Sequence, residues 1–166
     1  MGVAEDLTCV TLQERELRLP RFDPEVAWEL GTRLRTMAVE RGLAIVIDVR
    51  RFNQPLFYAA LEGTTPDNPE WVRRKSNVVA RYHRSSYGMG LNLKLKGQTL
   101  EERGHSTADF AAHGGSFPIH LEAAGILGSV TVSGLPQRAD HELVVEALCA
   151  HLGRDYESLK LGPEED

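Results

Sequence analysis

A histidine followed by two glycines, His113-Gly114-Gly115, is the segment of this sequence with the clearest chemical potential. Adjacent glycines tolerate positive φ angles and leave backbone N–H groups unshielded, so that a ligand can approach the main chain closely. The neighbouring imidazole can act as a metal or haem-iron ligand, a general base or a hydrogen-bond donor. A plain turn before a strand is the structural alternative for this segment.

The second feature is a run of positive charge between Trp71 and Lys96, which contains no acidic residue. Its seven basic residues are Arg73, Arg74, Lys75, Arg81, Arg84, Lys94 and Lys96. Such local density in a chain of net charge −5 indicates a site for carboxylates, phosphates or an acidic partner surface. A solvated helix face is the alternative, because Arg74, Arg81 and Arg84 fall opposite the apolar stripe of the same helix.

The remaining side chains give no recognised catalytic spacing. His113 and His141 are the only plausible acids or bases, and no HExxH, zinc, GxSxG, Walker or dinucleotide motif is present. Cys149 lies among apolar residues, which favours a buried inert thiol. Trp28, beside Gly31 on a helix flank, suits a subunit interface, with a partly covered surface aromatic as the alternative.

Length and composition predict a single soluble globular domain, with 166 residues of which 42% are hydrophobic and 26% charged. No apolar run approaches the ~20 residues that a membrane helix needs. Glu5 and Asp6 stand where a secretory signal would be basic and then apolar, and two cysteines are too few for a disulfide framework. A cytoplasmic protein is therefore expected. The pI of about 5.7 and the lack of a recognised motif argue against nucleic acid as a partner.

Helix and strand signals place these residues on secondary structure. The clearest helix opens with Asp23 as N-cap and Pro24 at its first position, and Gly42 ends it. The apolar, β-branched residues 43–50 and the following residues 55–61 predict an antiparallel hairpin. A second helix over residues 70–86 carries most of the basic run.

The second half of the chain is less regular. Helix and strand interpretations compete over residues 87–96, and a strand is predicted over 107–112. Two further strands, 119–121 and 126–132, are joined by a tight turn. Asp140 is the predicted N-cap of a last helix that Gly153 ends. Consecutive hairpin strands covered by helices indicate an α+β fold with an antiparallel sheet.

Several motifs occurring together resemble one family. They are WVRRKSN (71–77) with Arg81, SSY (85–87), AAHGGSFPI (111–119), VSGLPQ (132–137) and DHEL (140–143). This combination is similar to the haem-degrading-domain superfamily, which includes the GlcG-like and HbpS-like proteins, over residues 19–152. The resemblance implies a three-layer α/β/α domain around a five-stranded antiparallel, profilin-like sheet, assembled as a homo-oligomer. It also implies a domain over 19–153, preceded by an N-terminal extension (1–18) and followed by a C-terminal tail (154–166).

The resemblance makes haem or a related tetrapyrrole a candidate ligand. His113 would then be the axial ligand, and Phe117 and Met89 would be apolar walls. Lys75 or Arg81 would meet a propionate, and the same parts would equally bind a small carboxylate or phosphate on the glycine amides. The candidate ligand-binding residues are Lys75, Arg81, His113, Gly114, Gly115, Phe117 and His141; no metal site is expected. Three functions stay open: ligand binding, an enzyme acting on a small anionic metabolite, and a non-catalytic assembly module.

Overall fold

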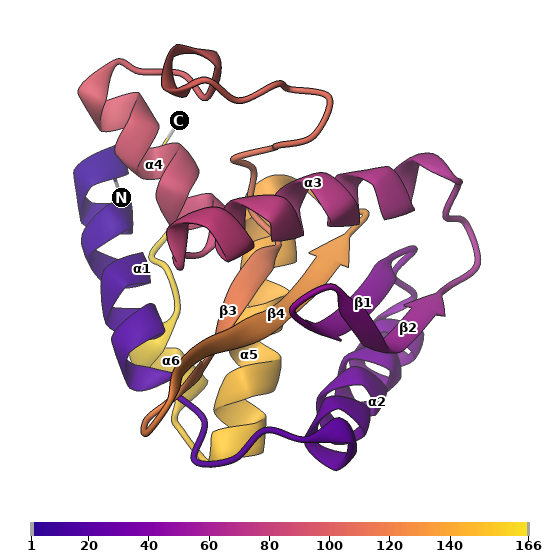
Figure 1. The fold of residues 1–166 in the computed structure, drawn as a ribbon. Helices are drawn as coiled ribbons and strands as arrows, with labels where there is room; N and C mark the ends of the chain where they lie inside the picture. Colours follow the sequence, from indigo (N-terminus) through magenta and orange to yellow (C-terminus); the bar gives the residue numbers. More distant parts are fainter. Residues whose placement is uncertain (1, 166) are drawn as a thin grey trace.

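A computed structural model describes residues 2–165, which form one antiparallel sheet with helices on both faces (Figure 1). The strands are β1 (Val46–Arg51), β2 (Gln54–Ala60), β3 (Ser116–Leu121) and β4 (Gly125–Ser133). Their order in the sheet is β2-β1-β4-β3, and each neighbouring pair is antiparallel. The predicted α+β class is confirmed. Within residues 2–165, however, the sheet has four strands, so the expectation of five is wrong.

The helices divide between the two faces of the sheet and one flank. Helices α2 (Pro24–Arg41) and α5 (Gln137–Leu152) pack together on one face, and α3 (Asp67–Tyr82) crosses the other. Helices α1 (Val3–Glu16) and α4 (Ser86–Lys96) pack against each other beside β3 (Figure 1). Two short elements, η1 (Glu101–Arg103) and α6 (Tyr156–Leu159), lie in the connecting and C-terminal segments.

The two faces of the sheet differ in chemistry, because successive side chains of a strand point to opposite faces. Toward α2 and α5 the strands contribute the main apolar core, with Ile47, Val49, Phe117, Ile119, Val130 and Val132. Toward α3 the buried residues include the polar side chains of Asp48, Ser116, Ser129, Thr131 and Ser133. The register pairs Thr131 with Asp48 on one side and with Ser116 on the other. A polar layer therefore lies between α3 and the sheet.

The structure confirms the predicted helix ends that depend only on residues a few positions away. The Asp23 carboxylate accepts a hydrogen bond from the Val26 N–H at 2.9 Å, and Gly42 ends α2 with a φ of 64°. Ser85 decides the ambiguous segment in favour of helix, because its hydroxyl accepts from the Gly88 N–H and caps α4.

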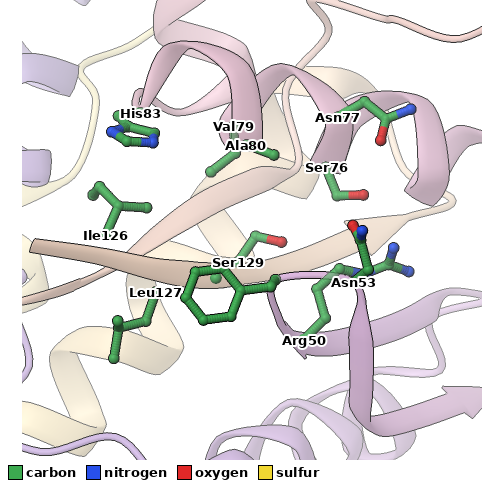
Figure 2. A pocket seen from close by; sticks show the side chains of 12 residues that line it. Arg50, Asn53, Ser76, Asn77, Val79, Ala80, His83, Ile126, Leu127 and Ser129 are labelled. Carbon is green, nitrogen blue, oxygen red and sulfur yellow. The ribbon is translucent and has the colours of Figure 1, made fainter.

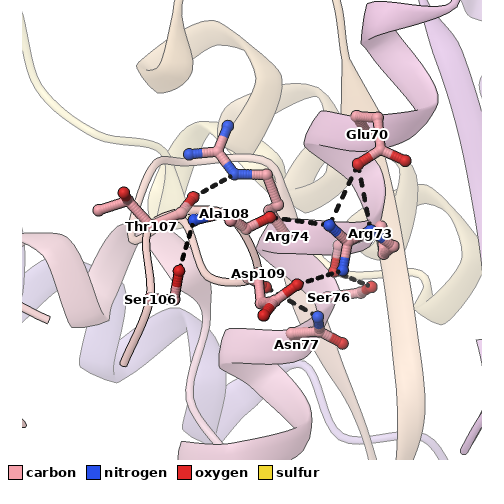
Figure 3. Close-up of polar contacts among 9 residues, drawn as sticks. All are labelled: Glu70, Arg73, Arg74, Ser76, Asn77, Ser106, Thr107, Ala108 and Asp109. Carbon is pink, nitrogen blue, oxygen red and sulfur yellow. Dashed lines mark hydrogen bonds and ion pairs between the residues drawn. The ribbon is translucent and has the colours of Figure 1, made fainter. Parts of the chain in front are cut away.

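Two local predictions are wrong. Residues 107–112 form no strand; instead, side chains of α3 bind the backbone carbonyls of this segment (Figure 3). Asp140 is not an N-cap, because α5 begins three residues earlier, after Pro136. Its carboxylate instead accepts from the backbone N–H groups of Leu135 and Gly134, at 2.9 and 3.4 Å.

The terminal segments pack onto the body of the fold. Val10 of α1 and Leu161 near the C-terminus form a small apolar cluster with Tyr87 and Leu91 of α4. Arg138 of α5 forms an ion pair with the buried Asp6 of α1 and donates a hydrogen bond to the Gly162 carbonyl. No helix within residues 2–165 is both long and apolar enough to cross a bilayer.

Candidate functional site

A buried ion pair between Lys75 and Asp140 joins α3 to the first turn of α5. Lys75 is 3% exposed and Asp140 1%. The Lys75 ammonium donates to Asp140 Oδ2 at 3.0 Å and to the Val132 carbonyl at 3.3 Å. Burial lowers the pKa of Lys75 and raises that of Asp140, while the attraction between the two charges opposes both shifts. Each charge therefore depends on the other to stay ionised.

The spacing of Lys75 in the sequence already indicates that it faces inward. Lys75 lies three residues after Val72 and four before Val79, which are both buried, so helical periodicity places it on the inner face of α3. The basic run is thus neither purely a solvated helix face nor purely an anion site.

Other members of the basic run hold the segment that leads to His113 (Figure 3). Arg73 contacts Glu70, the Asp109 carboxylate and the Ala108 carbonyl. The Arg74 Nε donates to the Thr107 carbonyl at 2.9 Å. The Asn77 side-chain amide donates to the Asp109 carbonyl at 2.8 Å. One face of α3 therefore positions the irregular chain between α4 and β3.

His113 stands at the surface beside this ion pair. Its ring packs edge-to-face on Trp71 with 5.3 Å between centroids, and the Arg74 guanidinium lies 4.4 Å from the centre of the same indole. Partial burial, followed by the charges of Lys75 and Arg74, lowers the pKa of His113. The imidazole is therefore neutral at neutral pH, and the electrostatic potential at the ring is positive.

Lys75, His113 and Asp140 border one surface hollow of about 300 Å³. Its other lining residues are Asn68, Trp71, Ser133, Gly134, Leu135 and Gln137. The acceptor oxygens of both amide side chains are already used: Asn68 Oδ1 accepts from the Thr65 N–H and Gln137 Oε1 from the Gly114 N–H. Their NH₂ groups remain as donors.

The two glycines serve close packing more than ligand access. A Cβ on Gly114 would lie 2.2 Å from the Gln137 carbonyl oxygen, and one on Gly115, where φ is 138°, would lie 2.4 Å from the Val132 carbonyl oxygen. The Gly114 N–H is engaged with Gln137 at 3.0 Å. Only a residue without a side chain fits at either position, because β4 and α5 approach so closely. The expectation that both amides would be open to a ligand is therefore wrong at Gly114.

The remaining candidate residues lie elsewhere. Phe117 is buried in the main core, on the sheet face opposite to Lys75, and Met89 is buried in a separate cluster between α3 and α4. His141 is fully buried, and burial lowers its pKa to about 3. Arg81 is exposed on α3 and does not line the hollow. Of the seven, the structure brings together Lys75, His113, Gly114 and Gly115.

The candidate set lacked seven of the hollow-lining residues: Asn68, Trp71, Ser133, Gly134, Leu135, Gln137 and Asp140. All of these except Asn68 fall inside the WVRRKSN, VSGLPQ and DHEL motifs, so motif membership was the available signal. Among residues 2–165 there is no group of three or more His, Cys, Asp or Glu side chains that could hold a metal ion.

Comparison with known proteins identifies the family. Residues 22–149 match the family model described as "Haem degrading protein HbpS-like", and the chain belongs to this family. The UPF0303 protein of Acidobacterium capsulatum is 63% identical over 162 residues, covering 97% of this chain and 98% of that protein. The UPF0303 protein of Paraburkholderia phymatum is 56% identical over the same shares of the two chains.

Solved structures share the fold. The crystal structure of the Ybr137w protein has a TM-score of 0.84 and 28% identity, covering 92% of each chain. HbpS has a TM-score of 0.63 at 19% identity, covering 82% of this chain and 94% of its own. The PduOC:Heme complex has a TM-score of 0.63 at 13% identity, covering 74% and 88%.

Proposed function

We propose that this protein binds a small anionic ligand in the hollow between Lys75, His113 and Gln137. One observation carries the proposal: the carboxylate and amide side-chain oxygens around the hollow are used within the chain, whereas several donors are left over. The leftover donors are one N–H of the Lys75 ammonium, the Ser133 hydroxyl, and the NH₂ groups of Asn68 and Gln137. A surface made of donors suits carboxylate or phosphate oxygens.

The charges around the hollow support an anion as well. Asp140 balances Lys75, but its oxygens are already occupied by Lys75 and by two backbone N–H groups. Arg74 lies over the Trp71 ring and adds a second positive charge. His113, neutral at neutral pH, offers a single N–H donor at the mouth and becomes a third cation in acid.

Calorimetric titration with malonate and with inorganic phosphate at low ionic strength tests the proposal. We expect one saturable site per chain that weakens with added salt. His113→Ala and Ser133→Ala should each weaken binding about tenfold, since a hydrogen bond to a charged group is worth about 1.5–3 kcal/mol. Ser129→Ala is the matched control, because Ser129 and Ser133 share one strand and one face but Ser129 lies outside this hollow. Equal effects of the two serine variants would contradict the assignment.

Haem is the second candidate ligand. The lowered pKa of the exposed His113 leaves an unprotonated imidazole, which is the form that ligates iron. The family description names haem degradation, and PduOC is described as a heme complex. The residues expected as walls do not fit, because Phe117 and Met89 lie in the core, and the large apolar side chains that line the hollow are Trp71 and Leu135. Haem at His113 would therefore need apolar surface from a second copy of the chain.

A haemin titration followed at the Soret band separates the two ligands. A saturable band at a fixed ratio per chain that shifts in His113→Ala would support haem at this histidine. A broad, unsaturated response that is identical in both proteins would exclude haem there and leave the small anion. Histidine-dependent turnover of an anionic metabolite would make the same hollow an active site.

We also propose that the protein forms a homo-oligomer through the outer edge of β2. This strand ends the sheet, and residues 56–60, which follow Pro55, contain neither a charged side chain nor a proline that would block pairing. Tyr58 on this strand and Trp28 on α2 are large exposed aromatics close to that edge. Gly31, beside Trp28, leaves no open notch for a partner, because a Cβ there would meet the Phe57 ring.

A further inference from the structure

A second hollow lies on the other side of α3, between this helix, β4 and the β1–β2 turn (Figure 2). It has a volume of about 90 Å³. Figure 2 shows a polar end with Arg50, Asn53, Ser76 and Asn77, and an opposite end with His83, Ile126 and Leu127. Small residues on the facing elements, Ser76 and Ala80 of α3 and Gly128 and Ser129 of β4, leave the space open.

Two hydrogen-bond donors border this hollow without a partner in the described chain. Arg50 uses Nε and Nη2 to grip both oxygens of the buried Asp48, at 2.7 and 2.9 Å. This pairing fixes the guanidinium plane and leaves Nη1 without a bond to residues 2–165. Ser129 is 3% exposed, and its hydroxyl likewise makes no hydrogen bond within those residues. Both donors border the hollow and are free to donate to an acceptor that enters it.

The hollow is also flanked by local backbone strain. Among the described residues, Phe52 and His83 are the non-glycine residues with positive φ, at 53° and 56°. Both line this one hollow, although they come from different elements, the β1–β2 turn and the end of α3. Strained conformations of this kind cluster at functional sites. Phe52 is also 68% exposed, so its ring is free to pack against a ligand in the hollow.

Backbone hydrogen bonds hold both the turn that carries Phe52 and the end of α3 at the edges of this hollow. The Phe52 N–H donates to the Leu127 carbonyl of β4 at 2.9 Å, so the turn is tied to the strand beneath it. At the other end, the His83 N–H donates to the Val79 carbonyl and closes α3. The apolar walls of the hollow are thus set before any ligand arrives.

We propose that this second hollow binds a small carboxylic acid with a single apolar ring. The carboxylate would accept from Arg50 Nη1 and the Ser129 hydroxyl, and the ring would lie against Val79 and Leu127 under Phe52. A benzene ring fills a cavity of roughly 150 Å³, so part of a single ring would extend from this hollow into solvent. A hollow of about 90 Å³ that opens to solvent takes most of one ring and excludes a tetrapyrrole. The site is separate from the hollow at Lys75.

Benzoate is the probe, with benzamide as its neutral counterpart, each followed by protein NMR and calorimetry. We expect benzoate to saturate one site with shifts at Ser129 and His83, and benzamide to bind at least about tenfold more weakly. Ser129→Ala should weaken benzoate about fivefold or more, and Ser133→Ala should leave it unchanged. Ala80→Trp fills the hollow from exposed helix surface and should abolish binding while preserving the fold.

Other outcomes would overturn the inference. Benzoate that fails to saturate, that binds no better than benzamide, or that is weakened equally by Ser129→Ala and Ser133→Ala would each remove this site. Because the Lys75 hollow is tested with malonate and phosphate and responds to Ser133→Ala, either site can fail while the other stands.

Discussion

The Nε2 of His141 lies 2.8 Å from Oε1 of Gln13, joining α5 to α1 at a point where both side chains are fully buried. Gln13 donates its amide protons to the Leu159 carbonyl and to Glu142, so its oxygen is the acceptor and the imidazole Nε2 carries the proton. Nδ1 is then unprotonated, buried and without a partner in the described chain. A second proton on this ring would place a charge inside the core.

Acid should therefore destabilise the protein through His141. Burial lowers its pKa to about 3, whereas the unfolded chain titrates near the ordinary value of 6.5. Between these values the unfolded state binds more protons, so stability is complete above about pH 6.5 and falls as the pH drops toward 3. The slope approaches about 1.4 kcal/mol per pH unit. Urea unfolding at several pH values measures it, and His141→Gln should flatten the curve; an unchanged curve would contradict this origin.

Replacing only one partner of the Lys75–Asp140 pair should lower the stability of the folded state strongly. Lys75→Met leaves a buried carboxylate, and Asp140→Asn leaves a buried ammonium, so each should lower stability by about 3–5 kcal/mol. The double variant Lys75→Met/Asp140→Leu removes both charges and should lose less than either single variant. Chemical denaturation of the three proteins gives the comparison. A double variant that loses the sum of the two single effects would show that the charges act independently.

Gly115→Ala should destabilise the fold strongly. The new Cβ would lie 2.4 Å from the Val132 oxygen and 2.8 Å from the Lys75 ammonium, at a φ of 138°. Gly42→Ala is the matched control, because Gly42 also has positive φ but nothing lies within 4 Å of the added atom. The control should cost about 1–2 kcal/mol and Gly115→Ala distinctly more. Equal melting temperatures would mean that the chain at Gly115 relaxes without cost.

Tyr58→Lys should separate the copies if β2 forms the interface. Lysine on an edge strand disfavours pairing with another chain, and here it would lie opposite Asp48, which tolerates a positive charge. Light scattering after size exclusion, or native mass spectrometry, should report a smaller species. Thr36→Lys, on the exposed side of α2, is the control that should leave the assembly unchanged. A Tyr58→Lys protein of unchanged mass would place the interface elsewhere.

Short-range signals were enough for the boundaries of α2 and for the two hairpins. The Asp23 cap, the Gly42 stop and the β-branched run before Arg50 act within a few residues, so no distant contact is needed to interpret them. The Asp140 prediction failed because Pro136 starts α5 one turn earlier, and an acidic residue in a first turn resembles an N-cap. The segment 107–112 failed because side chains of α3, far away in sequence, bind its backbone.

Only the part of the candidate site that is contiguous in sequence could be predicted. His113, Gly114 and Gly115 stand together in the chain, whereas Asp140 meets Lys75 only after α3 and α5 pack on the same end of β4. Phe117 was misplaced although alternation along β3 contained the answer. Ser116 is its neighbour and hydrogen-bonds to Thr131 on the α3 side, so Phe117 must point to the opposite face.

The unequal faces of the sheet have a consequence for how this family can diversify. The face under α2 and α5 holds the continuous apolar core, where a lost methylene group is felt as lost stability. The face under α3 carries short hydroxyl side chains such as Ser129 and Ser133, whose exchange removes little apolar burial. New ligand preferences can therefore arise by substitution on that side during evolution while the folded state persists.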